Sequence, residues 1–203
     1  MSVTESLAHF VDHHLKAWPE LEAPFDPAWR SPCEIGEPYT RQSGNGSGDL
    51  AEFIRWHPVK RSLADDFPGL ENALETEIHP DIKAYYAAFW SGNLEAEAPD
   101  GHVSLILLWN PDDAERLIEN QIGHALVNRR SKSPLSLFFA CTEPESDLIL
   151  TVRNDSGEVL LERPGYKPLR TVAGSLAEFL DLLAPVGPGA NSALLPAISA
   201  PGP

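Results

Sequence analysis

The 203-residue sequence contains only two cysteines, Cys33 and Cys141, and a single methionine. Two cysteines cannot build the disulfide framework of a small secreted domain, so the reducing cytoplasm is the simplest compartment. No apolar run approaches the roughly 20 residues that span a bilayer. Residues 1–14 lack a basic region followed by an apolar stretch, so we expect no signal peptide. Any membrane association is therefore expected to be indirect.

Basic side chains are also scarce. The chain has 15 Lys and Arg against 30 Asp and Glu, which gives a formal net charge of −15. Such a surface repels nucleic-acid phosphate and anionic lipid headgroups. A basic protein surface is the partner that its field favours. Charge alone favours a simpler alternative, because many cytosolic proteins are acidic only for solubility.

Motifs for catalysis or metal binding are lacking. The GNGSG segment at 44–48 has neither the preceding apolar strand nor the following lysine of a phosphate-binding loop. Cys141 and His124 could form a nucleophile pair, but Cys141 ends an apolar run and is expected to be buried without an activating group. His9 and His13 are four residues apart, a spacing that can bind metal, yet both lie off the apolar stripe and should be solvated. We predict no enzymatic activity, no cofactor and no metal.

The clearest local signal runs from Trp109 to Arg130 and predicts a complete helix. Asn110 can cap it, and Pro111 suits the first helical position. Acidic residues in the first turn favour the positive end of the helix dipole. The residues expected to face the core are Ala114, Leu117, Ile118, Gln121, Ile122 and Ala125.

Polar residues of this helix divide into two groups. Asp112, Glu115 and Glu119 lie on the side opposite the apolar stripe. A second group of polar residues, Asp113, Asn120 and His124, shares one edge. His124 has three interpretations, as a hydrogen-bonded packing residue, a partner contact or a catalytic base, and the first is favoured. The acidic face is either a solvated surface or a place where something basic docks.

The other segments predict an α/β (α+β) fold, with one mostly antiparallel or mixed sheet and helices packed on it. Helices are expected at 3–17, 70–78, 82–89 and 175–183. Strands are expected at 53–56 and 135–141, with hairpins at 94–98/102–109 and 148–154/158–163. We expect residues 19–50 to be an extended connection with one strand near 33–35. The Pro/Gly/Ala-rich residues 186–203 are expected to be a disordered tail.

Several segments in order resemble one bacterial family. The run WNPDDAERLIENQIGH at 109–124, followed by RRSKSPLSLFFA at 129–140, resembles the Syd proteins, the SecY-interacting family. SPC at 31–33, the strand ending in Trp56, residues 78–92, NDSGEV at 154–159 and LAEFL at 176–180 agree as well. The likeness covers roughly residues 5–185 and predicts a single Syd-like domain over 1–185.

The resemblance implies a SUKH-like α/β fold with an acidic concave groove and a function without catalysis. Syd proteins bind SecY, the channel subunit of the protein translocase, at the cytoplasmic side of the inner membrane. They are thought to monitor the translocase or to regulate it negatively. By position, the family's acidic stretch matches Asp112, Asp113, Glu115 and Glu119.

The resemblance also suggests how the contact would be completed. We expect Asn120 and His124 at the contact, with Trp109 or Trp90 supplying short-range affinity and the chain acting as a monomer. GNGSG resembles a local insertion, and the tail extends past the family's usual end. The alternative function is a SUKH-type immunity protein that binds a toxin.

Overall fold

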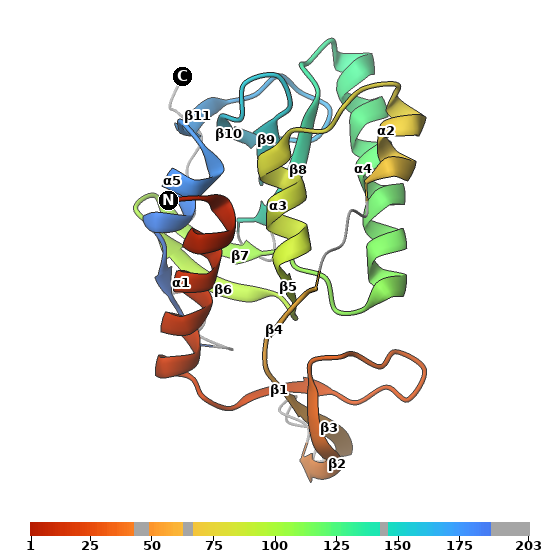
Figure 1. The fold of residues 1–203 in the computed structure, drawn as a ribbon, viewed down its shortest axis with the longest axis vertical. Coiled ribbons are helices and arrows are strands. Elements are labelled where there is room, and N and C mark those ends of the chain that lie inside the picture. The colour runs from red at the N-terminus through yellow and green to blue at the C-terminus, as the bar shows by residue number, and fades with distance from the viewer. Residues whose placement is uncertain (43–48, 63–66, 143–145, 188–203) are drawn as a thin grey trace.

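A seven-stranded antiparallel sheet forms the centre of the computed structural model, which describes residues 1–42, 49–62, 67–142 and 146–187 (Figure 1). The strand order is β11-β10-β9-β8-β7-β6-β12. The strands are β6 Leu94–Ala98, β7 Gly101–Leu105, β8 Ser136–Cys141, β9 Ile149–Arg153, β10 Val159–Glu162, β11 Arg170–Ala173 and β12 Ala184–Pro185. The predicted fold class, a mostly antiparallel sheet with helices packed on it, is confirmed.

Alternation along the strands gives the sheet two different faces. In β6, Leu94 and Ala96 are buried towards the helices, whereas Glu95 points to the opposite face. Helices α1 Val3–Ala17, α3 Pro80–Ala88 and α5 Leu176–Asp181 cover the first face (Figure 1). Phe139 of β8 joins these layers, because its ring lies 5.6 Å from that of Tyr85 and 5.7 Å from that of Phe179.

Helix α4, Pro111–Ser131, packs against β8, and α2, Pro68–Leu74, packs on α4. The prediction for α4 is confirmed at its start and along its apolar side. Ala114, Leu117 and Ala125 are buried, and Ile118 and Ile122 are half-buried against the core.

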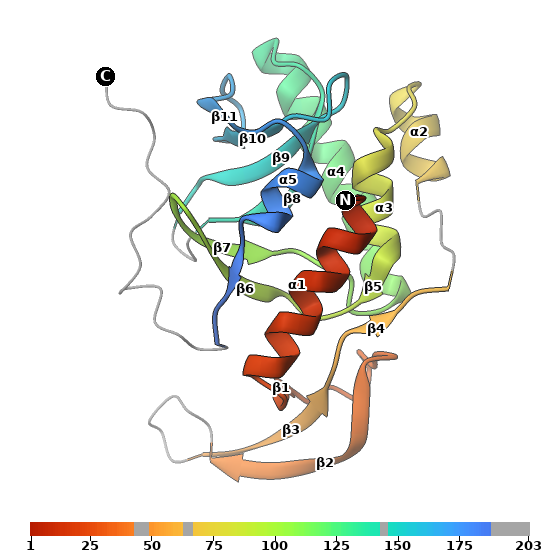
Figure 2. The same ribbon diagram turned by 60° about the vertical axis from the view of Figure 1, so that its left-hand side comes forward.

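A second, three-stranded sheet corrects the expectation for residues 19–50. It contains β1 Leu21–Pro24, β2 Glu34–Gln42 and β3 Leu50–Trp56, in the order β1-β3-β2. Figure 2 shows it below the main sheet, and the two-residue strands β4 Val59–Lys60 and β5 Phe89–Trp90 pair nearby. The sequence concealed β1 and β2 because both are largely exposed and contain proline, so their pairing with β3 gives no apolar alternation.

Smaller differences concern element ends. Helix α2 ends at Leu74 rather than near Ile78, because Glu75 adopts a left-handed conformation with φ of 53°. Strand β7 ends at Leu105, before the expected Trp109. The short edge strands β11 and β12 were not anticipated. The predicted disordered tail, residues 186–203, is wrong at its first residue, because the Val186 backbone N–H donates to the Glu95 carbonyl at 3.0 Å. Residues 44–48 and 188–203 lie outside the described residues, so the expected insertion and the rest of the tail stay predictions.

The turn between β9 and β10 is held against the start of α3. Asn154 accepts a hydrogen bond from the His79 backbone N–H at 2.9 Å and donates to the Glu77 carbonyl at 2.9 Å. Gly157 in this turn has φ of +76°, and a Cβ there would lie 2.7 Å from the His79 ring. Both the backbone conformation and the space therefore require glycine.

Gly157→Ala should lower the free energy of unfolding by roughly 1–3 kcal/mol, because the added methyl group meets both strain and a clash. Gly123→Ala is the matched control, since no atom lies within 4 Å of a Cβ at this position in α4. It should raise stability by up to about 1 kcal/mol, the usual gain for alanine over glycine in a helix. Urea unfolding measures both, and equal effects would contradict the described turn.

Candidate docking site

The first turn of α4 is tied to the segment that precedes β2. Asn110 caps the helix as predicted, because its Oδ1 accepts a hydrogen bond from the Asp113 backbone N–H at 2.8 Å. Its Nδ2 donates to the Arg30 carbonyl at 2.9 Å. The indole of Trp109 donates to the Trp29 carbonyl at 3.0 Å. These contacts bring together residues about 80 positions apart in the sequence.

A recess opens at this junction, with a volume of about 210 Å³. We call it the tryptophan recess, and its lining residues are Ala23, Pro24, Asp26, Trp29, Glu34, Ser91, Gly92, Asn93, Leu107, Trp109 and Asp113. The lining contains three carboxylates and two indoles. None of these described lining residues is lysine or arginine. The recess therefore combines a negative field with flat aromatic surfaces, a pairing that suits a cationic side chain.

Local hydrogen bonds fix the three carboxylates in place. Glu34 pairs with Arg30 and accepts from the Ser31 backbone N–H at 3.0 Å. Asp26 accepts from the Ala28 N–H at 2.8 Å. Asp113 accepts from the Trp109 N–H at 3.0 Å through Oδ2.

A cation of the chain itself already lies near this recess. The Arg116 guanidinium stands 5.2 Å from the centre of the Trp29 ring and 4.0 Å from Oδ1 of Asp113. Arg116 is exposed, so this contact is weak. It nevertheless displays the ligand chemistry that Trp29 and Asp113 favour.

A second recess lies further along α4, towards its C-terminal end. We call it the histidine recess, and it has a volume of about 410 Å³. It is lined by Ile106, Asn120, His124, Val127, Phe138, Cys141, Ile149 and Pro164. Most of these residues are apolar, in contrast to the tryptophan recess.

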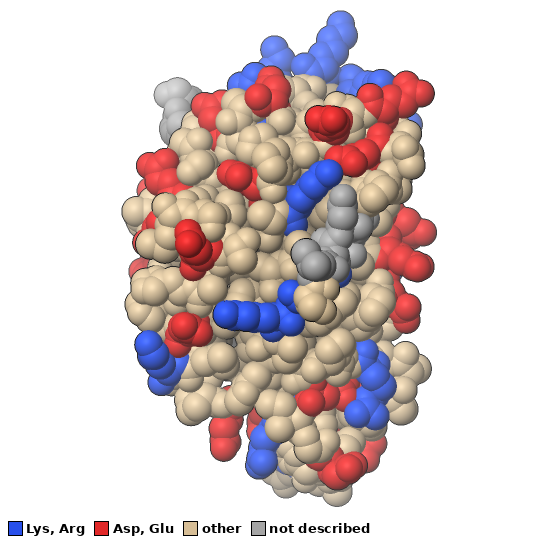
Figure 3. All heavy atoms as spheres, in the orientation of Figure 1, with Lys and Arg blue, Asp and Glu red and all other residues tan. Residues whose placement is uncertain are grey.

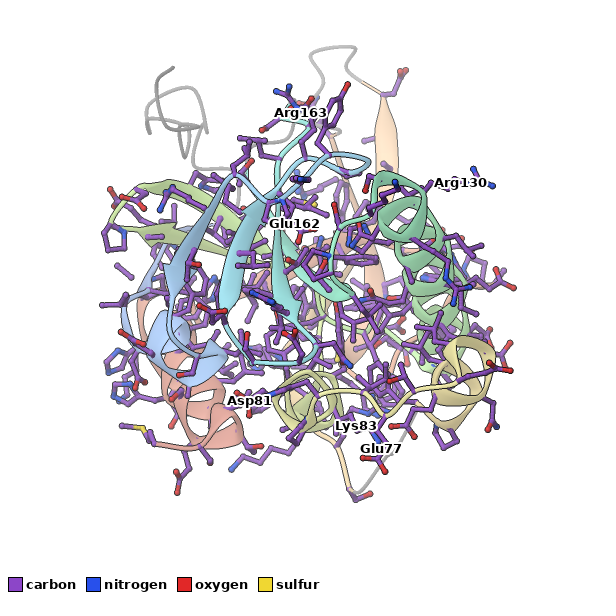
Figure 4. The ribbon with its side chains drawn as sticks, turned by 90° about the horizontal axis from the view of Figure 1, so that it is seen from above. Glu77, Asp81, Lys83, Arg130, Glu162 and Arg163 are labelled. Atoms are coloured by element: carbon purple, nitrogen blue, oxygen red, sulfur yellow. The ribbon has the colours of Figure 1, made fainter. Side chains whose placement is uncertain are left out.

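A buried polar network lies behind His124 of the histidine recess. His124 Nε2 lies 3.2 Å from Ser136 Oγ, which also donates to Glu162 Oε2 at 3.0 Å. Asn128 donates to the same serine at 2.9 Å. Figure 4 shows Glu162 among the strands, whereas Arg163 lies at the periphery, where it pairs with Asp147. His124 is therefore a hydrogen-bonded packing residue, the interpretation that its position favoured.

The network combines serine, histidine and carboxylate without the access that catalysis needs. Ser136 is fully buried, so no substrate can reach its hydroxyl. Cys141 lines the same recess as His124 and is half-buried, not buried as expected. Burial, with a smaller contribution from the Glu95 carboxylate, raises the pKa of the Cys141 thiol. A raised pKa disfavours the thiolate that a nucleophile requires.

Residues 4–185 match the family model described as Syd protein (SUKH-2). The chain belongs to the Syd family. Protein Syd of Pseudoalteromonas atlantica is 38% identical over 178 residues, which cover 88% of this chain and 89% of the relative. Protein Syd of Colwellia psychrerythraea is 42% identical over 164 residues, 78% of each chain. Protein Syd of Hahella chejuensis is 48% identical over 135 residues, which cover 66% of this chain and 69% of the relative.

This Syd-family chain separates the seven predicted contact residues into three places. Trp109 and Asp113 line the tryptophan recess, and Asn120 and His124 line the histidine recess. The other three, Asp112, Glu115 and Glu119, are exposed and line neither recess. They point outward because the opposite side of α4 is anchored on β8, and Figure 3 shows acidic side chains along the outer edge of this region.

The two recesses share one edge of α4. Asp113 and Asn120 are two helical turns apart, or about 10 Å along the axis. The consecutive residues Ile106 and Leu107 line one recess each. Together the two recesses are the candidate docking surface, which has an acidic, aromatic end and an apolar end.

Sequence reasoning missed Asp26, Trp29 and Glu34, which supply two of the three carboxylates and one of the two indoles of the tryptophan recess. They fall in residues 19–50, where no local pattern shows that the segment folds back onto α4. Trp90, a candidate for short-range affinity, lines neither recess and instead packs beneath the Arg61 guanidinium at 3.8 Å.

Two further observations bear on function. Within the described ranges, no helix is both long and apolar enough to cross a bilayer. The described part of the chain also contains no group of three or more His, Cys, Asp or Glu side chains placed to hold a metal ion. His9 and His13 are exposed, as expected, with ring centres 4.1 Å apart.

Proposed function

We propose that this Syd-family chain is a non-catalytic protein that binds the basic cytoplasmic loops of SecY. Bound as a monomer at the cytoplasmic side of the inner membrane, it would monitor or negatively regulate the translocase. The observation that carries the proposal is the tryptophan recess, in which three carboxylates and two indoles converge without a lysine or arginine in the described lining. A lysine or arginine from a loop would find both charge and a flat aromatic surface there.

The exposed acids of α4 would contribute differently from the recess. Asp112, Glu115 and Glu119 stand in solvent, where their attraction is long-ranged, screened by salt and weak at contact. We infer that they speed encounter with a basic loop, together with the overall charge of −15. Carboxylates within the recess lose more water on binding and would slow dissociation. The proposed surface therefore keeps all the predicted contact residues, with different roles.

Binding to purified translocon in lipid nanodiscs tests this function. We expect the full chain to bind SecY-containing nanodiscs and to ignore nanodiscs of the same lipids without protein, since acidic surfaces repel anionic lipid. Affinity should fall by about tenfold or more between 0.05 and 0.5 M salt, as the screening length shortens. Binding that is absent, independent of salt or equal for empty nanodiscs would contradict the proposal.

The SUKH-2 description of the matching family model supports a second candidate, an immunity protein that neutralises a toxin. Such a protein could use the same acidic surface against a basic toxin. A toxin gene beside this one, and a tight complex between the two purified products, would favour this candidate over SecY.

A further inference from the structure

The histidine recess is apolar, whereas the proposed contact with a basic loop would by itself require only charged groups. Its volume of about 410 Å³ is within the roughly 300–1,000 Å³ typical of ligand pockets. Five of its eight lining residues are Ile106, Val127, Phe138, Ile149 and Pro164. Apolar walls form few hydrogen bonds with water, so the burial of a large apolar side chain against them would favour binding.

The walls of this recess are held rigidly. Gln121 of α4 donates to the Phe138 carbonyl at 2.8 Å and accepts from its N–H at 3.3 Å, which locks the helix to β8. The rings of His124 and Phe138 meet edge to face, with centres 5.9 Å apart. Ser136 and Asn128 fix His124 from below. A recess built in advance in this way costs a partner little reorganisation.

The spacing of the two recesses sets the spacing of their ligands. Asp113 and Asn120 mark the two recesses about 10 Å apart along α4. An extended peptide advances about 3.3 Å per residue. Side chains four residues apart lie on the same side of such a peptide, so one segment could reach both recesses.

We propose that the histidine recess holds a large apolar side chain of the same basic segment whose lysine or arginine occupies the tryptophan recess. This inference rests on the proposed function and adds a second specificity element to it. The ligand is then a bipartite peptide, with a cation and a phenylalanine, leucine or methionine four residues away.

Charge decides between a partner and the chain's own C-terminal residues. Residues 188–203 contain apolar side chains but no lysine or arginine. They could fill the apolar recess alone, and they have no cation for the carboxylates of the tryptophan recess. Only a basic partner complements both ends of the surface.

Alkylation of Cys141 reports directly on occupancy of the recess. Cys141 is half-buried in the lining, whereas Cys33 is fully buried and should react far more slowly. Two synthetic peptides would be tested for binding to the full chain, and each peptide contains two arginines. One carries phenylalanine four residues after the first arginine, and the other carries serine there. The phenylalanine peptide should bind at least tenfold more tightly and slow Cys141 alkylation at least tenfold.

A variant that fills the recess provides the second arm. Asn120 is exposed at its rim, so Asn120→Trp should fold normally and cover the opening. It should abolish the advantage of phenylalanine over serine. Asn72→Trp, at an exposed position of α2 that lines neither recess, is the matched control and should preserve that advantage.

Each contradicting result leads to a different conclusion. Equal affinity of the two peptides, with unprotected Cys141 and intact salt-dependent binding to SecY, would overturn the apolar subsite and leave the proposed function standing. Loss of binding to both peptides and to SecY would overturn the function and the subsite together. A tenfold faster alkylation after deletion of residues 188–203, without peptide, would assign the recess to the chain's own tail and overturn the proposal.

Discussion

Neutralising the three carboxylates of the tryptophan recess should weaken binding to SecY roughly 100-fold, or about 2.7 kcal/mol. The variant is Asp26→Asn, Glu34→Gln and Asp113→Asn. Each amide keeps an oxygen that can accept the existing backbone hydrogen bond, from Ala28, Ser31 or Trp109. The change therefore removes charge and keeps these backbone hydrogen bonds, while Glu34→Gln also loses the ion pair with Arg30. Because charges enclosed at a contact act mainly after encounter, the loss should appear as faster dissociation.

The matched control removes the same number of charges from the outer face of α4. Asp112→Asn, Glu115→Gln and Glu119→Gln alter side chains that are exposed and line neither recess. Association should slow by a few fold at low salt, and dissociation should hardly change. Surface plasmon resonance with captured translocon nanodiscs separates the two rates. Equal increases in dissociation rate for both triple variants would show that the recess has no special role.

Phe139→Ala should cost about 3–5 kcal/mol of stability, the usual loss for a fully buried phenylalanine. Its side chain is completely buried and contacts the rings of Tyr85 and Phe179, so it joins β8 to α3 and α5. Removing it leaves a cavity between three elements that cannot close independently. Chemical denaturation followed by tryptophan fluorescence measures the loss.

The neighbouring residue gives a control on the opposite face of the same strand. Phe138 is half-buried, lines the histidine recess and contacts His124. Phe138→Ala should destabilise the chain less than Phe139→Ala, because less of its surface is buried. It should weaken binding of the phenylalanine peptide in the docking assay more than binding of the serine peptide. A larger stability loss for Phe138→Ala would mean that the two faces of β8 have been assigned the wrong way round.

Local chemistry made much of the fold predictable. The sequence Asn110–Pro111 gave the start of α4, and Ser175 gave the start of α5 in the same way. The alternation of apolar and polar residues, with polar turns between, predicted the hairpins β6–β7 and β9–β10. Their strands pair antiparallel, as expected. These signals lie within a few residues of the structure that they specify.

The recess could not be predicted, because it depends on contacts between distant segments. Trp29 and Trp109 meet through one hydrogen bond across 80 positions, and Glu34 belongs to a strand whose partner is β3. No periodicity or spacing in the sequence marks Trp29, Trp109 or Glu34 as members of one site. The acids of α4 were recognisable as a group, but which of them faces a recess follows only from how α4 lies on β8. Asp113 faces one, and its neighbour Asp112 does not.

Site-specific photo-crosslinking tests the docking surface most directly. A photoreactive amino acid would replace Asn93 at the tryptophan recess, Asn120 at the histidine recess or the exposed Asp181 of α5. The protein would then be mixed with translocon nanodiscs. We predict crosslinks from positions 93 and 120 to one basic cytoplasmic segment of SecY, located by mass spectrometry, and none from position 181. Crosslinks to SecY from position 181, with none from positions 93 and 120, would contradict the account.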